Sequence, residues 1–408
     1  MLPQEFVLQT RYVMGQERFE RYLRSFSEEP PVSIRLNPLK TGSAAWKVDG
    51  AEPVPWCETG YYLRQRAPFT FDPLFHCGCY YVQEAASMFL SEILRQTAPQ
   101  AETALDLCAA PGGKTTLLRS LLPESCVLYS NEPVRNRASV LVENVAKWGY
   151  GLHYVTNGYA KDYLESGLTF DVVLCDVPCS GEGMFRRDEA TIGEWSPQAV
   201  AKCQRLQREI LTDAWRMLND GGLLIYSTCT FNIKENEENI AWLLSEHSDA
   251  GTVKIDVEEE WHVTGSLMEG FHEPVYRFIP GISRSEGLFV CVLRKSGSAA
   301  TPHVREKERK KTAPKASLHI VYPDNKRAAA TPQALVPLSY ADALRYLRGE
   351  ALTLPYSAPR GIVGLTFQGH ILGQAKNIGS RANNLYPKEW RIRTAHLPNE
   401  YEAILIPA

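Results

Sequence analysis

The feature that most constrains the fold is a regular alternation of short apolar runs with amphipathic segments, from about residue 100 to residue 293. The first five apolar runs end at or near Cys108, Asn131, Thr156, Cys175 and Ser227, and a sixth covers residues 288–293. Runs of this length between helix-like segments are typical of buried parallel strands. Repeated strand–helix–strand units with short connections therefore predict an α/β fold built as a doubly wound domain.

The segments on either side of this domain follow other patterns. Residues 1–80 predict a small α+β domain, with an amphipathic helix over residues 6–26 and an alternating strand over residues 32–37. That strand is expected to expose Ser33, Arg35 and Asn37 on one face. The α/β domain is expected to span residues 81–295 and to begin with a helix over residues 81–93.

The remaining residues predict a linker and a third domain. Residues 296–317 are basic and contain Gly, Ser, Ala and Pro, a composition that cannot bury a core, so we expect a linker or mobile arm there. In residues 318–408 apolar residues return together with turn signals, which predicts a small separate domain with a β-rich second half.

Composition excludes several classes of protein. The 408 residues are 44% hydrophobic and 22% charged, which is ordinary for a globular protein of two or three domains. No apolar run approaches the ~18 residues of a transmembrane helix, and the first residues do not resemble a secretory signal. The ten cysteines follow no disulfide spacing, so we expect reduced thiols in a cytoplasmic protein. His76, Cys77 and Cys79 lack a Cys-x-x-Cys pair, so we expect no metal site.

Two of the apolar runs end in thiol-bearing loops. The segment from Phe170 to Gly181 carries Asp176 and Cys179, and the segment from Leu223 to Thr230 carries Cys229. Functional residues of such sheets gather beyond the carboxyl ends of the strands, so these three side chains are expected to face one crevice. A carboxylate and two thiols in one crevice suggest covalent chemistry rather than packing.

A glycine-containing turn after the first strand predicts a cofactor site. Its backbone N–H groups and lysine suit a nucleoside cofactor with a charged amino-acid end. The residues expected to bind this cofactor are Cys108, Ala109, Ala110, Pro111, Gly112, Gly113 and Lys114, with Glu132, Arg137, Asn157 and Asp176 from later loops. Glu132 ends the second strand, where an acidic side chain commonly binds a ribose diol. An ATPase remains an alternative, although Cys108 stands where a P-loop has its first glycine.

The motifs Asp106-Leu-Cys-Ala-Ala-Pro-Gly-Gly-Lys-Thr, Asn131-Glu-Pro, Asp176-Val-Pro-Cys-Ser-Gly and Ser227-Thr-Cys-Thr resemble the Nol-Nop-Sun family of RNA cytosine-C5 methyltransferases. Residues 181–188 and 373–391 further resemble its bacterial RsmF-type members, which act on small-subunit ribosomal RNA. The resemblance implies a class I, Rossmann-like methyltransferase fold and S-adenosylmethionine as the cofactor. The family usually has an Asp after the third strand, where it contacts the adenine. In this chain Tyr159 stands at that position, so Asn157 becomes a candidate for the adenine contact.

The implied reaction explains why two thiols and a carboxylate occur together. Carbon 5 of cytosine becomes nucleophilic only after a thiolate adds to carbon 6. Asp176, if burial raises its pKa, can donate a hydrogen bond near nitrogen 3. A Pro-Cys thiol attacks in DNA methyltransferases, which would point to Cys179. The RNA family uses the Thr-Cys thiol, so the resemblance implies Cys229 as the nucleophile and Cys179 in product release.

RNA binding requires basic patches, since the net charge of the chain is only −3. Arg35 and Asn37 resemble a family Arg-x-Asn signature, and the C-terminal segment has the composition of a PUA-like RNA-binding domain. The residues expected to contact RNA are Arg35, Asn37, Arg186, Arg187, Lys376, Arg381, Lys388 and Arg391. We expect a monomer that acts on ribosomal RNA or the 30S subunit, without a membrane or metal partner. An RNA-binding assembly factor with an inactive catalytic domain remains the other alternative.

Overall fold

The computed structural model describes residues 2–42, 46–97, 100–297, 318–323, 332–394 and 396–407. Within these residues the central sheet has nine strands, eight of which follow one another in the spatial order β11 (Ala250–Thr252), β13 (Leu288–Lys295), β10 (Leu218–Thr228), β9 (Phe170–Asp176), β6 (Thr103–Asp106), β7 (Val127–Asn131), β8 (His153–Thr156) and β14 (Ile320–Tyr322). The ninth, β12 (Tyr276–Phe278), pairs with β13. The five strands from β10 to β8 are parallel. The predicted α/β fold is therefore confirmed.

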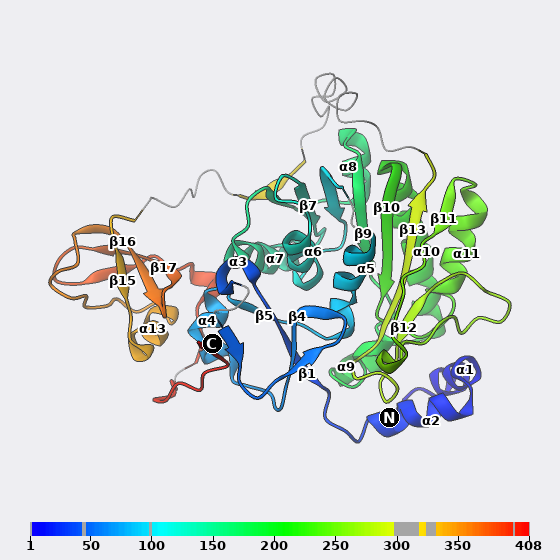
Figure 1. The fold of residues 1–408 in the computed structure, drawn as a ribbon, viewed down its shortest axis with the longest axis horizontal. Coiled ribbons are helices and arrows are strands. Elements are labelled where there is room, and N and C mark those ends of the chain that lie inside the picture. The colour runs from blue at the N-terminus through cyan, green and yellow to red at the C-terminus, as the bar shows by residue number, and fades with distance from the viewer. Residues whose placement is uncertain are drawn as a thin grey trace.

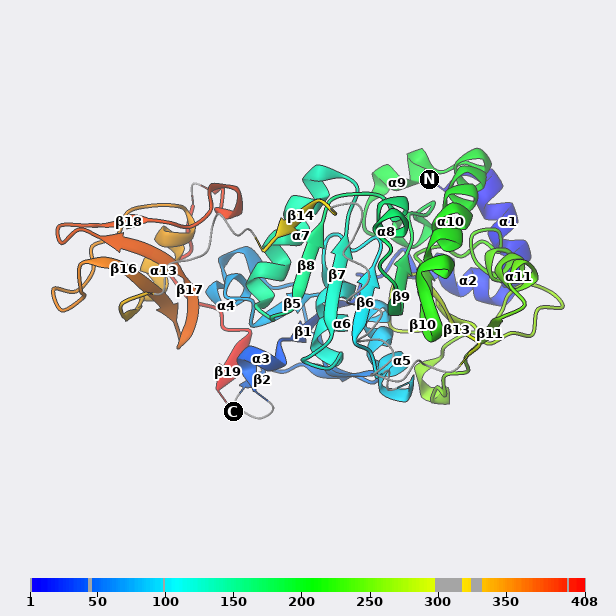
Figure 2. The ribbon, with the colours of Figure 1, turned by 90° about the horizontal axis from the view of Figure 1, so that it is seen from above.

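Helices cover both faces of this sheet (Figures 1 and 2). They are α5 (Leu90–Thr97), α6 (Gly113–Leu121), α7 (Arg135–Trp148), α8 (Ala160–Ser166), α10 (Pro197–Met217) and α11 (Glu237–Glu246). Successive residues of β9 point to opposite faces: Val172 and Leu174 pack with α5 and α6, whereas Val173 and Cys175 pack with α8, α10 and α11. This explains why β9 is continuously apolar, since both of its faces are buried.

The N-terminal helical pattern forms two helices rather than the single predicted one. Helices α1 (Gln4–Met14) and α2 (Gln16–Ser25) are separated by Gly15, whose φ of 75° ends α1. They pack against the domain of the central sheet, where Phe6 lies 5.0 Å from Phe185 and Tyr22 lies 5.2 Å from Phe231, measured between ring centroids. The helix pair therefore supports the loops that follow β9 and β10.

A four-stranded sheet lies beside the central one, in the order β3 (Glu52–Val54), β4 (Cys57–Leu63), β1 (Val32–Leu36) and β5 (Tyr80–Val82). Strand β5 corrects the predicted helix over residues 81–93, because Val82 and Tyr81 pair with Ile34 and Arg35 of β1. Helical structure begins only at η2 (Ala86–Phe89) and continues into α5. The short helices of these and neighbouring loops are α3 (Pro38–Thr41), η1 (Phe69–Phe71), α4 (Pro73–His76), η3 (Glu182–Met184), α9 (Glu189–Glu194) and η4 (Glu259–Trp261).

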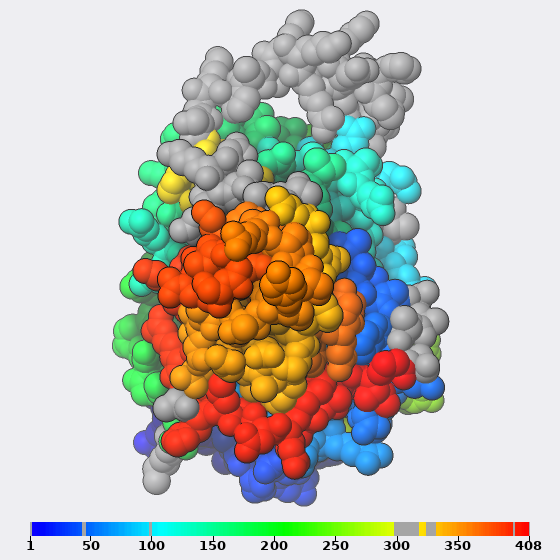
Figure 3. Space-filling view, turned by 90° about the vertical axis from the view of Figure 1, so that its left-hand side faces the viewer, coloured from blue at the N-terminus to red at the C-terminus, as the bar shows by residue number. Residues whose placement is uncertain are grey.

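The C-terminal residues form a smaller β-rich unit at one end of the molecule (Figures 1 and 3). Its sheet has the order β15 (Leu335–Pro337), β16 (Gly361–Phe367), β17 (His370–Asn377) and β18 (Ala382–Asn384), with α13 (Tyr340–Leu347) and η6 (Lys388–Trp390) beside it. The last strand, β19 (Leu405–Pro407), pairs with β2 (Trp46–Val48), so the C-terminal segment returns to the N-terminal domain.

The predicted boundary at residue 318 does not hold for one strand. Strand β14 pairs with β8, so this segment extends the central sheet and not the C-terminal unit. From residue 298 on, the predicted linker lies outside the described residues. Among the helices that the structure describes, none is both long enough and apolar enough to cross a bilayer.

Candidate active site

The two cysteines that end apolar runs lie side by side at the edge of the central sheet. Cys179 follows β9 and Cys229 follows β10, and these parallel strands pair in register up to Asp176 and Ser227. The Sγ atoms of the two cysteines are 3.2 Å apart. The strand order thus brings both thiols to one place, although 50 residues separate them in the chain.

A close backbone contact holds the loop of Cys179 against Cys229. The backbone N–H of Gly183, in η3, donates a hydrogen bond of 2.7 Å to the carbonyl oxygen of Cys229. A Cβ atom at position 183 would lie 2.8 Å from that oxygen and 2.8 Å from the Cα atom of Gly287. Glycine is required here because any side chain would push the two loops apart.

Two buried glutamates that the sequence analysis missed support both cysteine loops. Glu182 accepts hydrogen bonds from the N–H groups of Phe231 and Asn232, at 2.6 and 3.0 Å. Glu235 accepts one of 3.0 Å from the N–H of Ser180, and burial raises the pKa of its carboxyl group. One sequence signal could have indicated them: each glutamate lies within six residues of a cysteine, in a loop next to a strand end.

Asp176 lies in an ion pair at the same strand end. Its Oδ2 atom is 2.9 Å from Nζ of Lys114, and its Oδ1 atom accepts a hydrogen bond of 2.7 Å from Ser227. Burial acts to lower the pKa of Lys114, but the Asp176 carboxylate outweighs it, so the net shift is upward. Asp106 lies beside this pair. Its pKa is raised to about 8, mainly by burial and to a smaller extent by the charge of Asp176.

The surroundings of Cys179 shift the pKa of its thiol. The hydrogen bond to the Cys229 sulfur, followed by burial, raises the pKa of Cys179 well above its usual range. Cys179 therefore holds its proton more tightly than a free cysteine does. The thiolate is the reactive form of cysteine.

A pocket of ≈ 170 Å³ opens beside this ion pair. It is lined by residues of three segments: Tyr81, Val82, Gln83, Glu84 and Ser87; Asp106, Cys108, Ala109, Ala110, Pro111, Gly113 and Lys114; and Asp176. Among the described residues, the Oδ2 atom of Asp106 is buried and has no hydrogen-bond partner. A ligand ammonium group would give this oxygen a partner, and the adjoining glycine turn and lysine suit a carboxylate. The residues present thus fit the amino-acid end of S-adenosylmethionine.

Glu132 lies at the end of β7, next to the glycine turn. Its Oε1 atom accepts a hydrogen bond of 2.9 Å from Val134, and its Oε2 atom is 3.3 Å from Arg137. Arg137 in turn donates to the carbonyl of Ala110 in the turn, at 3.0 Å. Asn157 donates its amide N–H groups to the carbonyls of Glu132 and Pro133, so the ends of β7 and β8 are tied together.

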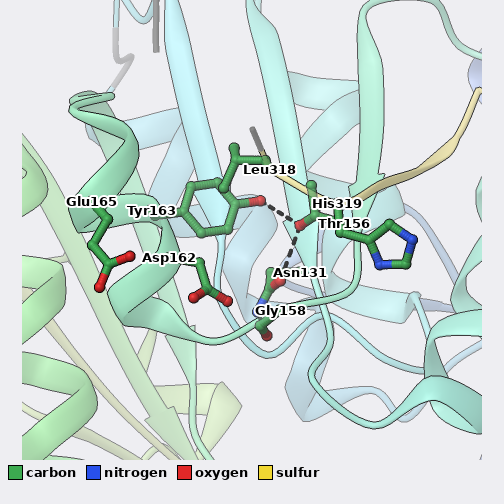
Figure 4. A pocket seen from close by; sticks show the side chains of 8 residues that line it. All are labelled: Asn131, Thr156, Gly158, Asp162, Tyr163, Glu165, Leu318 and His319. Carbon is green, nitrogen blue, oxygen red and sulfur yellow. Dashed lines mark hydrogen bonds between the residues drawn. The ribbon is translucent and has the colours of Figure 1, made fainter. Parts of the chain in front are cut away.

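A second pocket, of ≈ 210 Å³, lies past the ends of β7 and β8 (Figure 4). Thr156 joins Asn131 and Tyr163 in a chain of hydrogen bonds along one side, and Asp162, Glu165 and Leu318 also line it. The carbonyl of His319, just before β14, accepts a hydrogen bond of 3.0 Å from the N–H of Asn157. Tyr159 itself is 63% exposed and its N–H caps α8 by bonding to Asp162.

The structure contradicts the expectation that Arg35 and Asn37 face RNA. Both side chains are fully buried. Arg35 donates to Gln83 at 2.8 Å and to Thr116 at 2.7 Å, and its guanidinium lies over the ring of Trp148 at 4.4 Å. Asn37 donates to the carbonyls of Gly78 and Trp148. The alternation of β1 predicts one exposed face, but α6 and α7 pack on that face through Thr116 and Trp148.

The other predicted RNA contacts lie in two places. Arg186 has a side chain only 5% exposed and pairs with Glu286 at 3.1 Å, whereas Arg187 is exposed. Lys376, Arg381 and Lys388 are exposed on the C-terminal unit, and Arg391 is partly buried against Gly349. Contacts of these side chains with RNA remain predictions. In the part of the chain that the structure describes, no group of three potential metal ligands occurs.

Comparison with known proteins covers all three parts of the chain. Residues 94–294 match the family of 16S rRNA methyltransferase RsmB/F, residues 2–85 match the N-terminal domain of 16S rRNA methyltransferase RsmF, and residues 333–392 match the methyltransferase RsmF PUA domain. Ribosomal RNA small subunit methyltransferase F of Aliivibrio fischeri is 32% identical over 75% of this chain and 67% of its own length. The Klebsiella pneumoniae protein of the same name is 28% identical over 95% of this chain and 96% of its own length. The solved structure of a methyltransferase homolog protein from Pyrococcus horikoshii is 26% identical, with a TM-score of 0.58, over 70% of this chain and 93% of its own.

Proposed function

The chain belongs to the ribosomal RNA small subunit methyltransferase F family, whose members are S-adenosylmethionine-dependent ribosomal RNA methyltransferases, and on this premise we propose that it methylates carbon 5 of cytosine in 16S ribosomal RNA. The observation that carries the proposal is the pair of thiols 3.2 Å apart, next to the Asp176–Lys114 ion pair and the pocket of the glycine turn. Methyl transfer to an amine or hydroxyl group needs no thiol, whereas transfer to carbon 5 of a pyrimidine does.

The residues that line the pocket divide the work of holding the cofactor. S-adenosylmethionine, when bound, supplies an electrophilic methyl group. The turn from Cys108 to Gly113 and Lys114 would hold its carboxylate, and Asp106 its ammonium group. Glu132, 1% exposed and held by Arg137, would accept hydrogen bonds from the ribose hydroxyls. Asn157 stays the candidate for the adenine edge, because no hydrogen bond to its side-chain oxygen occurs among the described residues.

The resemblance to the RNA family supports Cys229 as the nucleophile and Cys179 as the thiol of product release. The Cys229 thiolate adds to carbon 6 of cytosine, so that carbon 5 becomes the nucleophile that takes the methyl group. Asp176 and Lys114, at the same strand end, would hold the polar edge of the ring. Cys179 would serve product release. After its own proton has passed to solvent, its thiolate takes the proton from carbon 5, the electrons of that C–H bond re-form the double bond between carbons 5 and 6, and the Cys229 sulfur leaves carbon 6 as a thiolate.

Nucleoside analysis tests this function directly. The purified chain is incubated with methyl-labelled S-adenosylmethionine and either naked 16S ribosomal RNA or small subunits, from a strain that lacks the gene. The RNA is then digested and its nucleosides are separated by mass spectrometry. We expect label in 5-methylcytidine, with the modified position found by bisulfite sequencing. Label in any other nucleoside, or none with either substrate, would contradict the proposal.

A further inference from the structure

A groove of ≈ 930 Å³ lies between the four-stranded sheet and the loops of the catalytic domain. It runs along the segment that joins α2 to β1, which crosses from the N-terminal helices to that sheet in Figure 1. Five arginines and two glutamates supply the charged groups of its lining: Arg64, Arg66, Arg186, Arg187, Arg284, Glu28 and Glu29. This is a local excess of positive charge on a chain whose net charge is −3.

Three of these arginines are not neutralised by the protein. Arg64, Arg66 and Arg187 are exposed, and none has a carboxylate within ion-pair distance among the described residues. Arg186 differs, because Glu286 balances its charge at the buried base of the groove. Arg284 pairs with Glu52 at 2.6 Å, but both side chains are at least half exposed, so this pair is weak. Uncompensated arginines along a groove are the typical footprint of a phosphate backbone.

Both walls of the groove are tied to the active site. The wall that carries Arg187 follows η3, whose Gly183 bonds to the carbonyl of Cys229. The wall that carries Arg284 continues to Glu286, whose N–H donates a hydrogen bond of 2.9 Å to Glu84, and Glu84 lines the cofactor pocket with Asp176. These contacts fix the position of the groove relative to the loops that carry the cysteines.

We propose that this groove, through Arg64, Arg66 and Arg187, holds the single-stranded ribosomal RNA that flanks the target cytosine. The proposal rests on the proposed function, since it assigns the path of that function's substrate. A target base must leave its stack to reach a buried site, and the phosphates on either side of it then need fixed cations. An arginine groove whose walls are tied to the thiol-bearing loops supplies them.

The test compares the triple variant R64Q/R66Q/R187Q with a charge-matched control, K161Q/R205Q/R216Q. The control residues are exposed on α8 and α10 and do not line the groove. Binding of a labelled single-stranded 16S fragment is measured at several salt concentrations, together with KM, kcat and the affinity for S-adenosylmethionine. An unchanged affinity for S-adenosylmethionine shows that each variant is folded.

For the groove variant we expect RNA binding weaker by about tenfold or more, and a salt-dependence slope smaller by about 2, because roughly 0.7 of a counterion is released for each phosphate contact. KM should rise while kcat is kept. A loss no greater than that of the control would overturn the proposal. So would a loss seen with assembled subunits but not with naked RNA, which would point to a protein partner. If the unmodified chain transferred no methyl group, the proposed function would fail, while the binding comparison would still decide the role of the groove.

Discussion

Replacing Arg35 by Met separates a structural role for this arginine from a role in binding RNA. Methionine has a similar length but no donors, so the change removes the hydrogen bonds to Gln83, Thr116 and the carbonyl of Gly113, as well as the contact with Trp148. Gly113 belongs to the cofactor turn and Gln83 lines the same pocket. We therefore expect both the free energy of unfolding and the affinity for S-adenosylmethionine to fall.

The size of the loss follows from opposing contributions. Two short charge-assisted hydrogen bonds contribute about 1.5–3 kcal/mol each, and the buried cation–π contact about 2 kcal/mol. Burial lowers the pKa of Arg35 from 12.5 to about 10, so keeping the charge buried costs about 3 kcal/mol. The net loss in unfolding free energy is therefore about 2–5 kcal/mol, in the range found when one partner of a buried charged network is removed.

Urea unfolding, titration calorimetry with S-adenosylmethionine and RNA binding are measured on Arg35→Met and on Arg216→Met, an exposed arginine on α10. The control should change stability by no more than about 0.5 kcal/mol. RNA affinity of the folded Arg35 variant should stay close to that of the unmodified chain. A variant of normal stability and normal cofactor affinity that had lost RNA binding would refute the structural role and restore the contact predicted from the sequence.

Three further changes test separate parts of the site. Glu132→Gln should raise the Kd for S-adenosylmethionine by about tenfold, the effect of one lost charged hydrogen bond, and an unchanged calorimetric Kd would exclude Glu132 as the ribose ligand. Because the pKa of Asp106 is raised from 3.8 to about 8, the folded protein retains a proton that the unfolded chain releases, so stability falls as the pH rises from about 4 to 8. Asp106→Asn should remove part of this fall in urea unfolding at pH 5 and pH 8, and an identical pH profile would argue against a protonated Asp106. Gly183→Ala should lower kcat by about a hundredfold at unchanged cofactor Kd, because its Cβ atom would displace Cys229, and normal kcat would show that the loop adjusts.

Local patterns were sufficient to predict the catalytic sheet. The apolar runs correctly predicted β6 to β10 and β13, and the strand ends that they define bring Asp176, Cys179 and Cys229 together. The start of α10 is another local feature, because Ser196 precedes Pro197 and its hydroxyl accepts the N–H of Ala199. These features depend on residues adjacent in the chain, which a sequence shows directly.

The features that the sequence did not reveal depend on contacts between distant segments. Arg35 alternates with apolar residues as an exposed side chain would, and its burial depends on Trp148, more than 100 residues away. Strand β14 is a short segment whose place is set by the free edge of β8. Glu182 and Glu235 resemble solvent-exposed loop residues until the backbone N–H groups that they bind are brought to them by the fold. Long-range burial of polar groups has no local sequence pattern.

A covalent RNA complex tests the central claim most directly, namely that a Cys229 thiolate adds to the pyrimidine ring while Cys179 serves release. Cys179→Ala and Cys229→Ala are each incubated with 16S ribosomal RNA and S-adenosylmethionine, and the products are separated on a denaturing SDS gel. We expect Cys179→Ala to accumulate a protein–RNA complex that survives SDS, and Cys229→Ala to form none. A stable complex with Cys229→Ala, or methylation by that variant, would contradict the assignment.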